Sequence, residues 1–344
     1  MSNAKKQFSL SICMPVYKGS HLLRGALESI YRQGFDFYEI IIGDDTPPDA
    51  AEELSRTRDI VASFGDKRIK YSQNARNLGY ALNLRDIVSR ASGDILFLMA
   101  QDDFLAKDAL SKTHNAFLLD DDIGVVTRPF YCFMDDMLKP VRAIFPHDSQ
   151  KDSILSLKDG EEVFRAVFGS VGQLTGLAYR REFLDVRFNE ECFPAHIYPF
   201  AGIFRSHKCV FLKDFTVAVG IRDSQTRSVS SIYSISPTDS WLRMYDTVFA
   251  GDKFREQRLW GRRHMATHFL GLAQLKNYAE PGVLAREIRI MAKAYRPNLF
   301  NPLFYLFSLG ALLVPRKILA PVVDLYKDSF NSRKKELRNI KFNY

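Results

Sequence analysis

In the first hundred residues, short apolar runs alternate with segments whose apolar residues recur at helical spacing. The segments 22–30 and 80–89 place apolar side chains on one face and predict helices. Four short runs between and around them predict buried strands: 9–16, 37–45, 68–72 and 94–100. Strands that alternate with helices form right-handed βαβ units. We therefore expect an α/β fold with a Rossmann-like, mostly parallel sheet.

The pattern changes twice further along the chain. Residues 123–220 contain more short apolar runs, with one helical pattern over Glu161–Phe168. From residue 236 onward, long helical patterns dominate: 241–249, 254–277, 282–295 and 301–330. We therefore expect an α/β domain over residues 1–235 and a C-terminal helical extension over residues 236–344.

Composition and charge add a second contrast between these parts. The 344 residues are 46% hydrophobic and 26% charged, which is typical of a globular protein. Residues 241–344 contain 19 basic and 8 acidic residues, whereas residues 1–240 carry a net charge of −3. A basic extension is expected to face an anionic partner. Nucleic acid is a poor fit, because no recognised binding module accompanies the charge.

The most apolar part of the chain lies near its C-terminal end. The run 302–314 has 13 residues, too few to span a bilayer, and the polar first ten residues do not resemble a signal peptide. We expect a cytoplasmic protein. Segment 301–330 permits two interpretations: helices lying on the inner face of the plasma membrane, or a helical pair that closes the core or forms a dimer interface. The basic run 333–341 is either attracted to anionic lipid or simply a solvated chain end.

Polar side chains follow each of the four predicted strands at its end. They are Tyr17, the pair Asp44 and Asp45, the segment 74–77, and the pair Asp102 and Asp103. Open parallel sheets bind ligands beyond the carboxyl ends of their strands, so we expect one site there. No GxGxxG or GxxxxGK[ST] sequence is present, which argues against phosphate-binding glycine loops. Carboxylates without such a loop suit a diphosphate held by a divalent metal.

Four segments, taken together and in this order, resemble the family 2 glycosyltransferases of GT-A fold. They are 11–17, 39–45, 77–83 and 93–103. The resemblance is specific over about residues 9–105, becomes looser to about residue 230 and lapses in the C-terminal helices. It implies an inverting enzyme that moves a sugar from a nucleotide diphosphate sugar to a hydroxyl of a saccharide or lipid-linked acceptor. Surface polysaccharide synthesis is the expected setting.

The resemblance also implies how the donor is held. Pro15, Val16 and Tyr17 would pack beside the nucleotide base and ribose, and Asp44 or Asp45 would accept a hydrogen bond from the base. Aspartates before prolines are also typical turn formers, so a structural role for this pair is an open alternative.

Further along, Asn77 and Gly79 would shape the loop beside the ribose and diphosphate. Asp102 and Asp103 would hold Mn²⁺ or Mg²⁺ on the diphosphate, with Asp102 close to the donor, although either could instead cap the next helix. The family often reads Asp-x-Asp-Asp at this point. This chain has Ala100 where the first of those aspartates would stand.

The family usually supplies its catalytic base from a Glu-Asp pair at the start of a helix. This chain has Ala-His there, so His196 is the first candidate base and Glu191, or its neighbour Glu190, the second. A histidine among aromatic residues is also often a packing residue. Arg222 and Arg227 follow the last predicted strand and are expected to contact the diphosphate, unless they belong to an ordinary surface loop.

A different class of function is left open by the two departures. A non-catalytic GT-A domain that binds nucleotide sugar or glycan, as a subunit of a larger assembly, would tolerate both Ala100 and the Ala-His pair. A nucleotidyltransferase is disfavoured, because no glycine-rich basic loop follows the first predicted strand.

Overall fold

The computed structural model describes residues 7–189, 195–222, 235–279, 281–315, 317–319 and 334–344. The chain forms two compact units, one of Met1–Arg222 together with Ile340–Tyr344 and the other of Asp223–Asn339. The division therefore lies before the boundary expected after residue 235. The last five residues return to the first unit, which the sequence pattern does not indicate.

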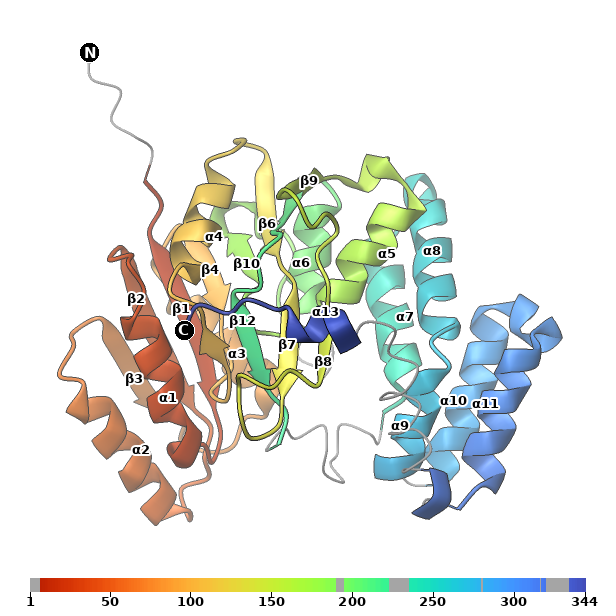
Figure 1. Ribbon diagram of the computed structural model, residues 1–344, viewed down its shortest axis with the longest axis horizontal. Helices are drawn as coiled ribbons and strands as arrows, with labels where there is room; N and C mark the ends of the chain where they lie inside the picture. The colour runs from red at the N-terminus through yellow and green to blue at the C-terminus, as the bar shows by residue number, and fades with distance from the viewer. Residues whose placement is uncertain (1–6, 190–194, 223–234, 280, 316, 320–333) are drawn as a thin grey trace. The chain divides into compact units, whose positions relative to one another are not determined.

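An eight-stranded sheet forms the centre of the first unit (Figure 1). Its strands, in spatial order, are β3 (Ile69–Gln73), β2 (Tyr38–Asp44), β1 (Leu10–Val16), β4 (Ile95–Leu98), β10 (Ala178–Arg180), β6 (Ile123–Thr127), β11 (Lys208–Phe211) and β9 (Ser153–Leu155). Strands β10 and β9 run antiparallel to their neighbours, and the others all point the same way. The expected mostly parallel α/β sheet is confirmed.

Helices cover both faces of this sheet. Those of the first unit are α1 (Ser20–Tyr31), α2 (Ala51–Ser63), α3 (Tyr80–Ser89), α4 (Ala109–Phe117), α5 (Glu161–Ser170) and α6 (Ile197–Phe204), with short 3-10 helices at η1 (Leu157–Asp159) and η2 (Arg181–Phe183). The expected helices over 22–30, 80–89 and 161–168 are confirmed. Helices α2 and α4 are additions to the expected elements.

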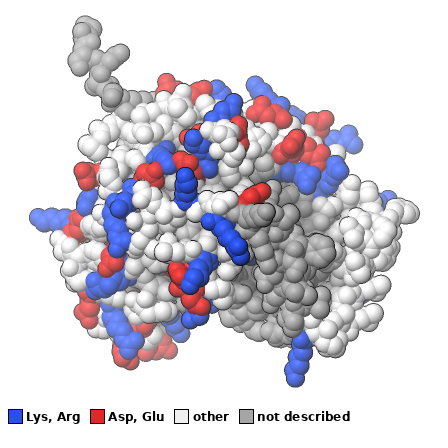
Figure 2. All heavy atoms as spheres, in the orientation of Figure 1, with Lys and Arg blue, Asp and Glu red and all other residues white. Residues whose placement is uncertain are grey.

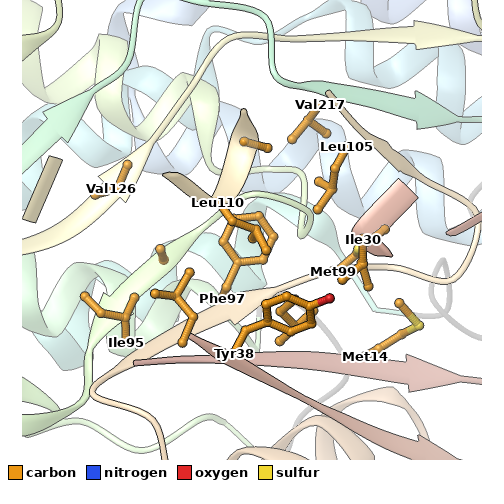
Figure 3. Packing of buried hydrophobic residues seen from close by; sticks show 14 of the residues in the cluster. Met14, Ile30, Tyr38, Ile95, Phe97, Met99, Leu105, Leu110, Val126 and Val217 are labelled. Carbon is orange, nitrogen blue, oxygen red and sulfur yellow. The ribbon is translucent and has the colours of Figure 1, made fainter. Parts of the chain in front are cut away.

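The alternation of side chains along β1 explains how both faces become buried. Leu10, Ile12 and Met14 point into one apolar cluster, which also contains Ile30 of α1 and residues of α4 (Figure 3). Cys13 points to the opposite face, where α3 contacts β1 and β2. A strand that is buried on both faces has a nearly continuous apolar sequence, and residues 9–16 have such a sequence.

A smaller sheet of the first unit supports the chain after β4. Its strands, in spatial order, are β5 (Phe104–Leu105), β12 (Val217–Gly220), β7 (Phe130–Phe133) and β8 (Arg142–Ile144). The C-terminal residues cover it: Ile340 and Phe342 pack against its apolar side chains, and the Asn343 carbonyl accepts a hydrogen bond from Lys107 N at 2.8 Å. Within the basic run 333–341, Ile340 packs on this sheet, whereas Arg338 and Lys341 are exposed, in keeping with the solvated interpretation.

The second unit is helical, as expected. It contains α7 (Pro237–Val248), η5 (Asp252–Phe254), α8 (Arg255–Ala266), α9 (Leu270–Tyr278), α10 (Pro281–Ala294), η6 (Arg296–Phe300), α11 (Pro302–Leu313) and α13 (Lys334–Arg338). Its own core includes Phe269, Leu272, Leu284 and Phe304. In the described part of the chain, no helix combines the length and apolar character needed to cross a membrane.

Candidate active site

The strand ends that carry the sequence motifs lie side by side. In the sheet, Val16 is paired with Asp44, and Asp44 with Gln73, so β1, β2 and β3 end at the same level. The backbone pairing continues one residue further. Asp45 N donates to Val16 O at 2.8 Å, and Asn74 N donates to Asp44 O at 2.9 Å. Residues far apart in the sequence are thereby brought to one edge, as the parallel topology predicts.

Asp45 holds the loop that leads into α3. Its Oδ1 accepts hydrogen bonds from Asn74 Nδ2 at 2.9 Å and Leu78 N at 2.7 Å, and its Oδ2 accepts one from Gly79 N at 2.8 Å. Asn77 Oδ1 also accepts from Gly79 N at 2.8 Å. Gly79 has φ of 80°, a conformation that favours glycine. The carboxylate therefore fixes the path of the loop, and a contact with the nucleotide base stays a prediction.

Asp44 is built into the sheet edge in a similar way. It is fully buried and accepts hydrogen bonds from Thr46 N at 3.0 Å and from the Tyr71 hydroxyl at 2.8 Å. Burial raises the pKa of Tyr71, and the hydrogen bond to Asp44 raises it further. The Thr46 hydroxyl accepts a hydrogen bond from Lys18 N at 2.8 Å and so joins the ends of β1 and β2. Asp44 thus links the end of β2 to β3 directly, and to the end of β1 through Thr46.

A side-chain amide joins the ends of β1 and β4. Tyr17 N donates to Gln101 Oε1 at 2.9 Å, and Gln101 Nε2 donates to Tyr17 O at 3.0 Å. Of the three residues expected beside the donor, Pro15 and Tyr17 are half-buried, whereas Val16 is fully buried in the core cluster. The period of two along β1 turns the Val16 side chain inward, and the expected position of these three residues beside the nucleotide stays a prediction.

Asp103 and Asp102 follow β4 at this edge and differ in surroundings. Asp103 is buried and accepts hydrogen bonds from Gln173 Nε2 at 2.6 Å, from Gly220 N at 2.9 Å and from the Thr175 hydroxyl. Burial raises the pKa of Asp103 well above its usual range, and the charge of Asp102 acts in the same direction. Asp102 is half-buried. The pair presents one enclosed and one accessible carboxylate.

This donor set suits a metal that is shared with a phosphate ligand. The described residues contain no cluster of three or more His, Cys, Asp or Glu side chains that could enclose an ion. Mg²⁺ in nucleotide sites usually takes only one or two carboxylates from the protein and the rest of its ligands from phosphates and water. Asp102 and Asp103 can supply that smaller share. The three groups that donate to Asp103 are neutral, so they supply no positive charge to favour its ionised form, and a bound divalent cation would supply that charge.

His196 lies at the start of α6 and is 3% exposed. Its Nε2 lies 3.1 Å from the Val171 carbonyl oxygen, and its Nδ1 lies 2.9 Å from the Tyr80 hydroxyl. A carbonyl only accepts, so Nε2 carries the proton of the neutral ring and Nδ1 accepts from Tyr80. Burial lowers the pKa of His196 to about 4. Both ring nitrogens therefore have protein partners, and the imidazole is a weak base.

The remaining candidates lie at or beyond the limits of the described chain. Arg222 is exposed and forms an ion pair with Asp135 of the β7–β8 connection. Arg227, Glu190 and Glu191 lie outside the described residues, so their predicted roles stay predictions.

Several residues of this edge carry no recognisable sequence signal. Gln101, Gln173 and Thr175 reach it through contacts between segments separated by 70 residues or more, as between Gln173 and Asp103. Tyr80 is the exception, because it directly follows the Asn77–Gly79 motif. Its position next to that motif is the sequence feature from which a place at the edge could have been predicted.

Comparisons with known proteins show which proteins this chain is similar to. Residues 11–177 match the family described as glycosyl transferase family 2. An uncharacterized glycosyltransferase of Haemophilus influenzae is 30% identical over 153 residues, which are 44% of this chain and 58% of that protein. Abequosyltransferase RfbV of Salmonella typhimurium is 35% identical over 105 residues, which are 30% of each chain. This chain thus spans only part of the curated relatives it matches.

Solved structures extend the likeness in fold over both units. TarS residues 1–349 of S. aureus, in complex with UDP-GlcNAc, align with a TM-score of 0.62 and 16% identity over 93% of this chain and 92% of that one. The mannosyltransferase PcManGT of Pyrobaculum calidifontis, in complex with GDP-Man and Mn²⁺, aligns with a TM-score of 0.55 and 15% identity over 96% and 88%. The matched segment and the shared fold together show that this chain is similar to glycosyl transferase family 2 over residues 11–177.

Proposed function

We propose that this chain is an inverting glycosyltransferase that moves a sugar from a nucleoside diphosphate donor to a hydroxyl of a saccharide or lipid-linked acceptor. The observation that carries the proposal is the edge where β1, β2, β3 and β4 end. Hydrogen bonds there join Tyr17 to Gln101, and join Asp45 both to Val16 and to the loop before α3. Structures similar in fold hold UDP-GlcNAc or GDP-Man, which supports this class of donor. A role in surface polysaccharide synthesis belongs to the same proposal.

In this proposal, different residues at the edge contact different parts of the donor. Pro15, Val16 and Tyr17 flank the base and ribose, and Asp44 or Asp45 accepts a hydrogen bond from the base. The two carboxylates also fix the strand ends and the Asn77–Gly79 loop. A loop held by buried carboxylates is in place before the donor arrives, which reduces the entropy lost on binding. Arg222 and Arg227 stay predicted contacts of the diphosphate.

The pair Asp102 and Asp103 would hold Mn²⁺ or Mg²⁺, which neutralises the charge that develops on the departing diphosphate. In the reaction, the acceptor oxygen forms a bond to the anomeric carbon while the bond from that carbon to the diphosphate breaks. The acceptor hydroxyl loses its proton to a base of the protein. Attack from the face opposite the diphosphate inverts the configuration at the anomeric carbon.

The surroundings of His196 change the order of the two candidate bases. An imidazole with a pKa of about 4, whose Nδ1 accepts from Tyr80, has little affinity for the proton of an acceptor hydroxyl. We therefore propose Glu191 as the base and assign His196 to holding the Tyr80 hydroxyl at the start of α3.

Release or transfer of the sugar from a panel of UDP-, GDP- and dTDP-sugars, with and without Mn²⁺, tests the function. One donor should be turned over, Asp102→Asn should reduce turnover at least a hundredfold, and Asp59→Asn on the exposed face of α2 should leave it unchanged. Glu191→Gln should abolish transfer while donor binding persists, whereas His196→Asn should retain more activity. Equal loss in both variants would contradict the assignment of the base.

One observation favours a second function. Ala100 stands where the family often has a carboxylate, so this position has no polar side chain to offer a donor or a metal. Its backbone N–H donates to the Thr175 hydroxyl at 2.8 Å. A non-catalytic domain that binds nucleotide sugar would tolerate the missing carboxylate. Metal-dependent donor binding without turnover for any saccharide or lipid-linked acceptor would support that alternative.

A further inference from the structure

The second unit exposes an unusual concentration of apolar side chains around α11. Of the 17 large hydrophobic side chains that are exposed in the described part of the chain, nine lie between Leu299 and Ile318. Phe300 is 88% exposed, Leu313 75% and Leu306 65%. A soluble monomer rarely exposes a contiguous apolar patch of this kind without an interaction partner.

The geometry of α11 explains why these side chains share one surface. Phe304, Ser308 and Ala311 recur at intervals of three and four residues and form the buried side of the helix. The other side is also apolar, and its exposed residues are Leu303, Tyr305, Leu306, Leu309, Leu312 and Leu313. We call these six residues the α11 face. In Figure 2 the surface over α11 is largely white, in keeping with this composition.

Basic residues flank the α11 face in the sequence, and acidic residues are missing from this stretch. Residues 288–323 contain five basic side chains and no acidic one. Arg296 and Lys317 are exposed on either side of α11, and Lys276 Nζ lies 3.4 Å from the Leu312 carbonyl oxygen. An apolar face with a cationic rim is the pattern of helices that lie in the interface of an anionic bilayer.

We propose that the α11 face is a membrane-docking surface for a bilayer that contains anionic lipid. The apolar side chains enter the boundary between headgroups and acyl chains, and Arg296 and Lys317 contact the lipid phosphates. The helix has 12 residues and rises about 1.5 Å per residue, so it is too short to cross the hydrocarbon core and lies along the surface instead. This inference concerns a surface outside the donor site and does not depend on the activity proposed above.

The same rim argues against a second copy of the chain as the occupant. Two copies that met through their α11 faces would bring like-charged rims together, whereas anionic lipid brings the opposite charge.

Flotation with phosphatidylcholine vesicles, with and without phosphatidylglycerol, tests the proposal on the full chain. The double variant Leu306→Gln with Leu313→Gln should weaken binding to the anionic vesicles at least about tenfold, because two inserted leucines are lost. The matched control is Leu119→Gln with Leu138→Gln in the first unit, whose side chains are 56% and 69% exposed. It should bind as the unchanged chain does. All four side chains are exposed, so both variants should fold, which circular dichroism can verify.

Arg296→Gln with Lys317→Gln should remove most of the preference for anionic over neutral vesicles. Donor binding should be the same in all these variants, which separates this inference from the proposed function. The proposal is overturned if the unchanged chain fails to float with anionic vesicles, or if both leucine double variants float equally well. It is also overturned if sedimentation shows a dimer that only the α11 variant dissociates, because the face would then join two copies.

Discussion

At Gly79, the backbone conformation of one residue determines how the loop of the candidate site enters α3. Its φ is 80°, and among the described residues an added Cβ would meet no atom within 4 Å, so a substitution there is resisted by the backbone alone. Gly65, in the exposed connection before β3, has φ of 59° and equally open surroundings. Gly79 also has ψ of 159°, a combination that is essentially restricted to glycine, so Gly65 is a control for positive φ alone.

We expect Gly65→Ala to lower the free energy of unfolding by about 1 kcal/mol, because alanine is strained at positive φ. Gly79→Ala should lower it by at least as much, on the order of 1–3 kcal/mol, because its φ and ψ together are essentially restricted to glycine. Only Gly79→Ala should also weaken binding of the nucleotide sugar, since its N–H is held by Asp45. Urea unfolding and a donor titration of both variants check this. Equal donor affinities in the two variants would show that the loop does not contribute to the site.

The burial of His196 makes stability depend on pH. Its pKa is lowered to about 4 in the folded chain from 6.5, so between these values the unfolded chain binds more protons. The contribution of His196 is therefore absent above about pH 6.5 and destabilises the fold as pH falls toward 4. Over this range the free energy of unfolding should decrease by about 3 kcal/mol.

Urea unfolding at a series of pH values, compared with His196→Asn, measures this contribution. The difference in stability between the two chains should change across this pH window and stay constant above it. His268 also has a lowered pKa because of burial, but both chains keep His268, so its contribution cancels in the comparison with His196→Asn. A difference between the unchanged chain and His196→Asn that does not vary with pH would contradict the buried, neutral ring.

The sequence indicates which residues stand at the edge of the sheet but not what each one does there. Asp45 and Asp103 are expected to meet ligand, yet their oxygens accept hydrogen bonds from Gly79 and Gly220, which lie 34 and 117 residues away in sequence. Such partners depend on tertiary contacts that a local pattern does not contain. The half-buried Asp102 is the carboxylate whose surroundings agree best with its predicted role.

Among the elements, those with a clear period are the ones that sequence reasoning predicts well. The run 80–89 coincides with α3, whose buried residues Ala81, Leu84 and Ile87 recur at helical spacing. The helical pattern over 254–277 was expected to be continuous but is divided into α8 and α9, because Thr267 ends the first helix and Phe269 turns into the core of the second unit. Periodicity misses this break, beside which Phe269 is buried in the core of the second unit.

The C-terminal residues are a second element that the charge pattern obscured. Phe342 contacts Tyr131 of β7 edge to face, with ring centroids 5.3 Å apart, and Tyr344 contacts Phe104 of β5 in the same manner at 5.7 Å. The Arg32 guanidinium lies 4.1 Å from the Tyr344 ring centroid. These aromatic contacts stabilise the small sheet that directly follows Asp103.

We expect Phe342→Ala to lower the free energy of unfolding of the first unit by about 2 kcal/mol, less than for a fully buried phenylalanine. Phe300→Ala is the control, because its side chain is 88% exposed and should have almost no effect. Thermal unfolding of both variants measures the difference. Similar melting temperatures would show that the C-terminal segment is not held on the small sheet.

At the scale of the whole molecule, the two units differ in how much the sequence reveals. The family motifs lie in residues 11–177, and there the order of strands and the position of the site follow from rules for parallel sheets. The helical unit has no such motif. Its arrangement of α7 to α11 depends on contacts such as the buried Glu287, which accepts hydrogen bonds from the Ser236 hydroxyl and from Thr238 N at 3.0 Å.

The central claim is that the edge formed by β1 to β4 binds a nucleoside diphosphate together with a divalent metal. The most direct test is titration of Mn²⁺ by electron paramagnetic resonance, with and without UDP or GDP. Two carboxylates alone hold Mn²⁺ weakly, so tight binding should appear only with the nucleotide and should be lost in Asp102→Asn. The claim would be contradicted if the affinity for Mn²⁺ were the same with and without the nucleotide. It would also be contradicted if the nucleotide bound equally well without the metal and in Asp102→Asn.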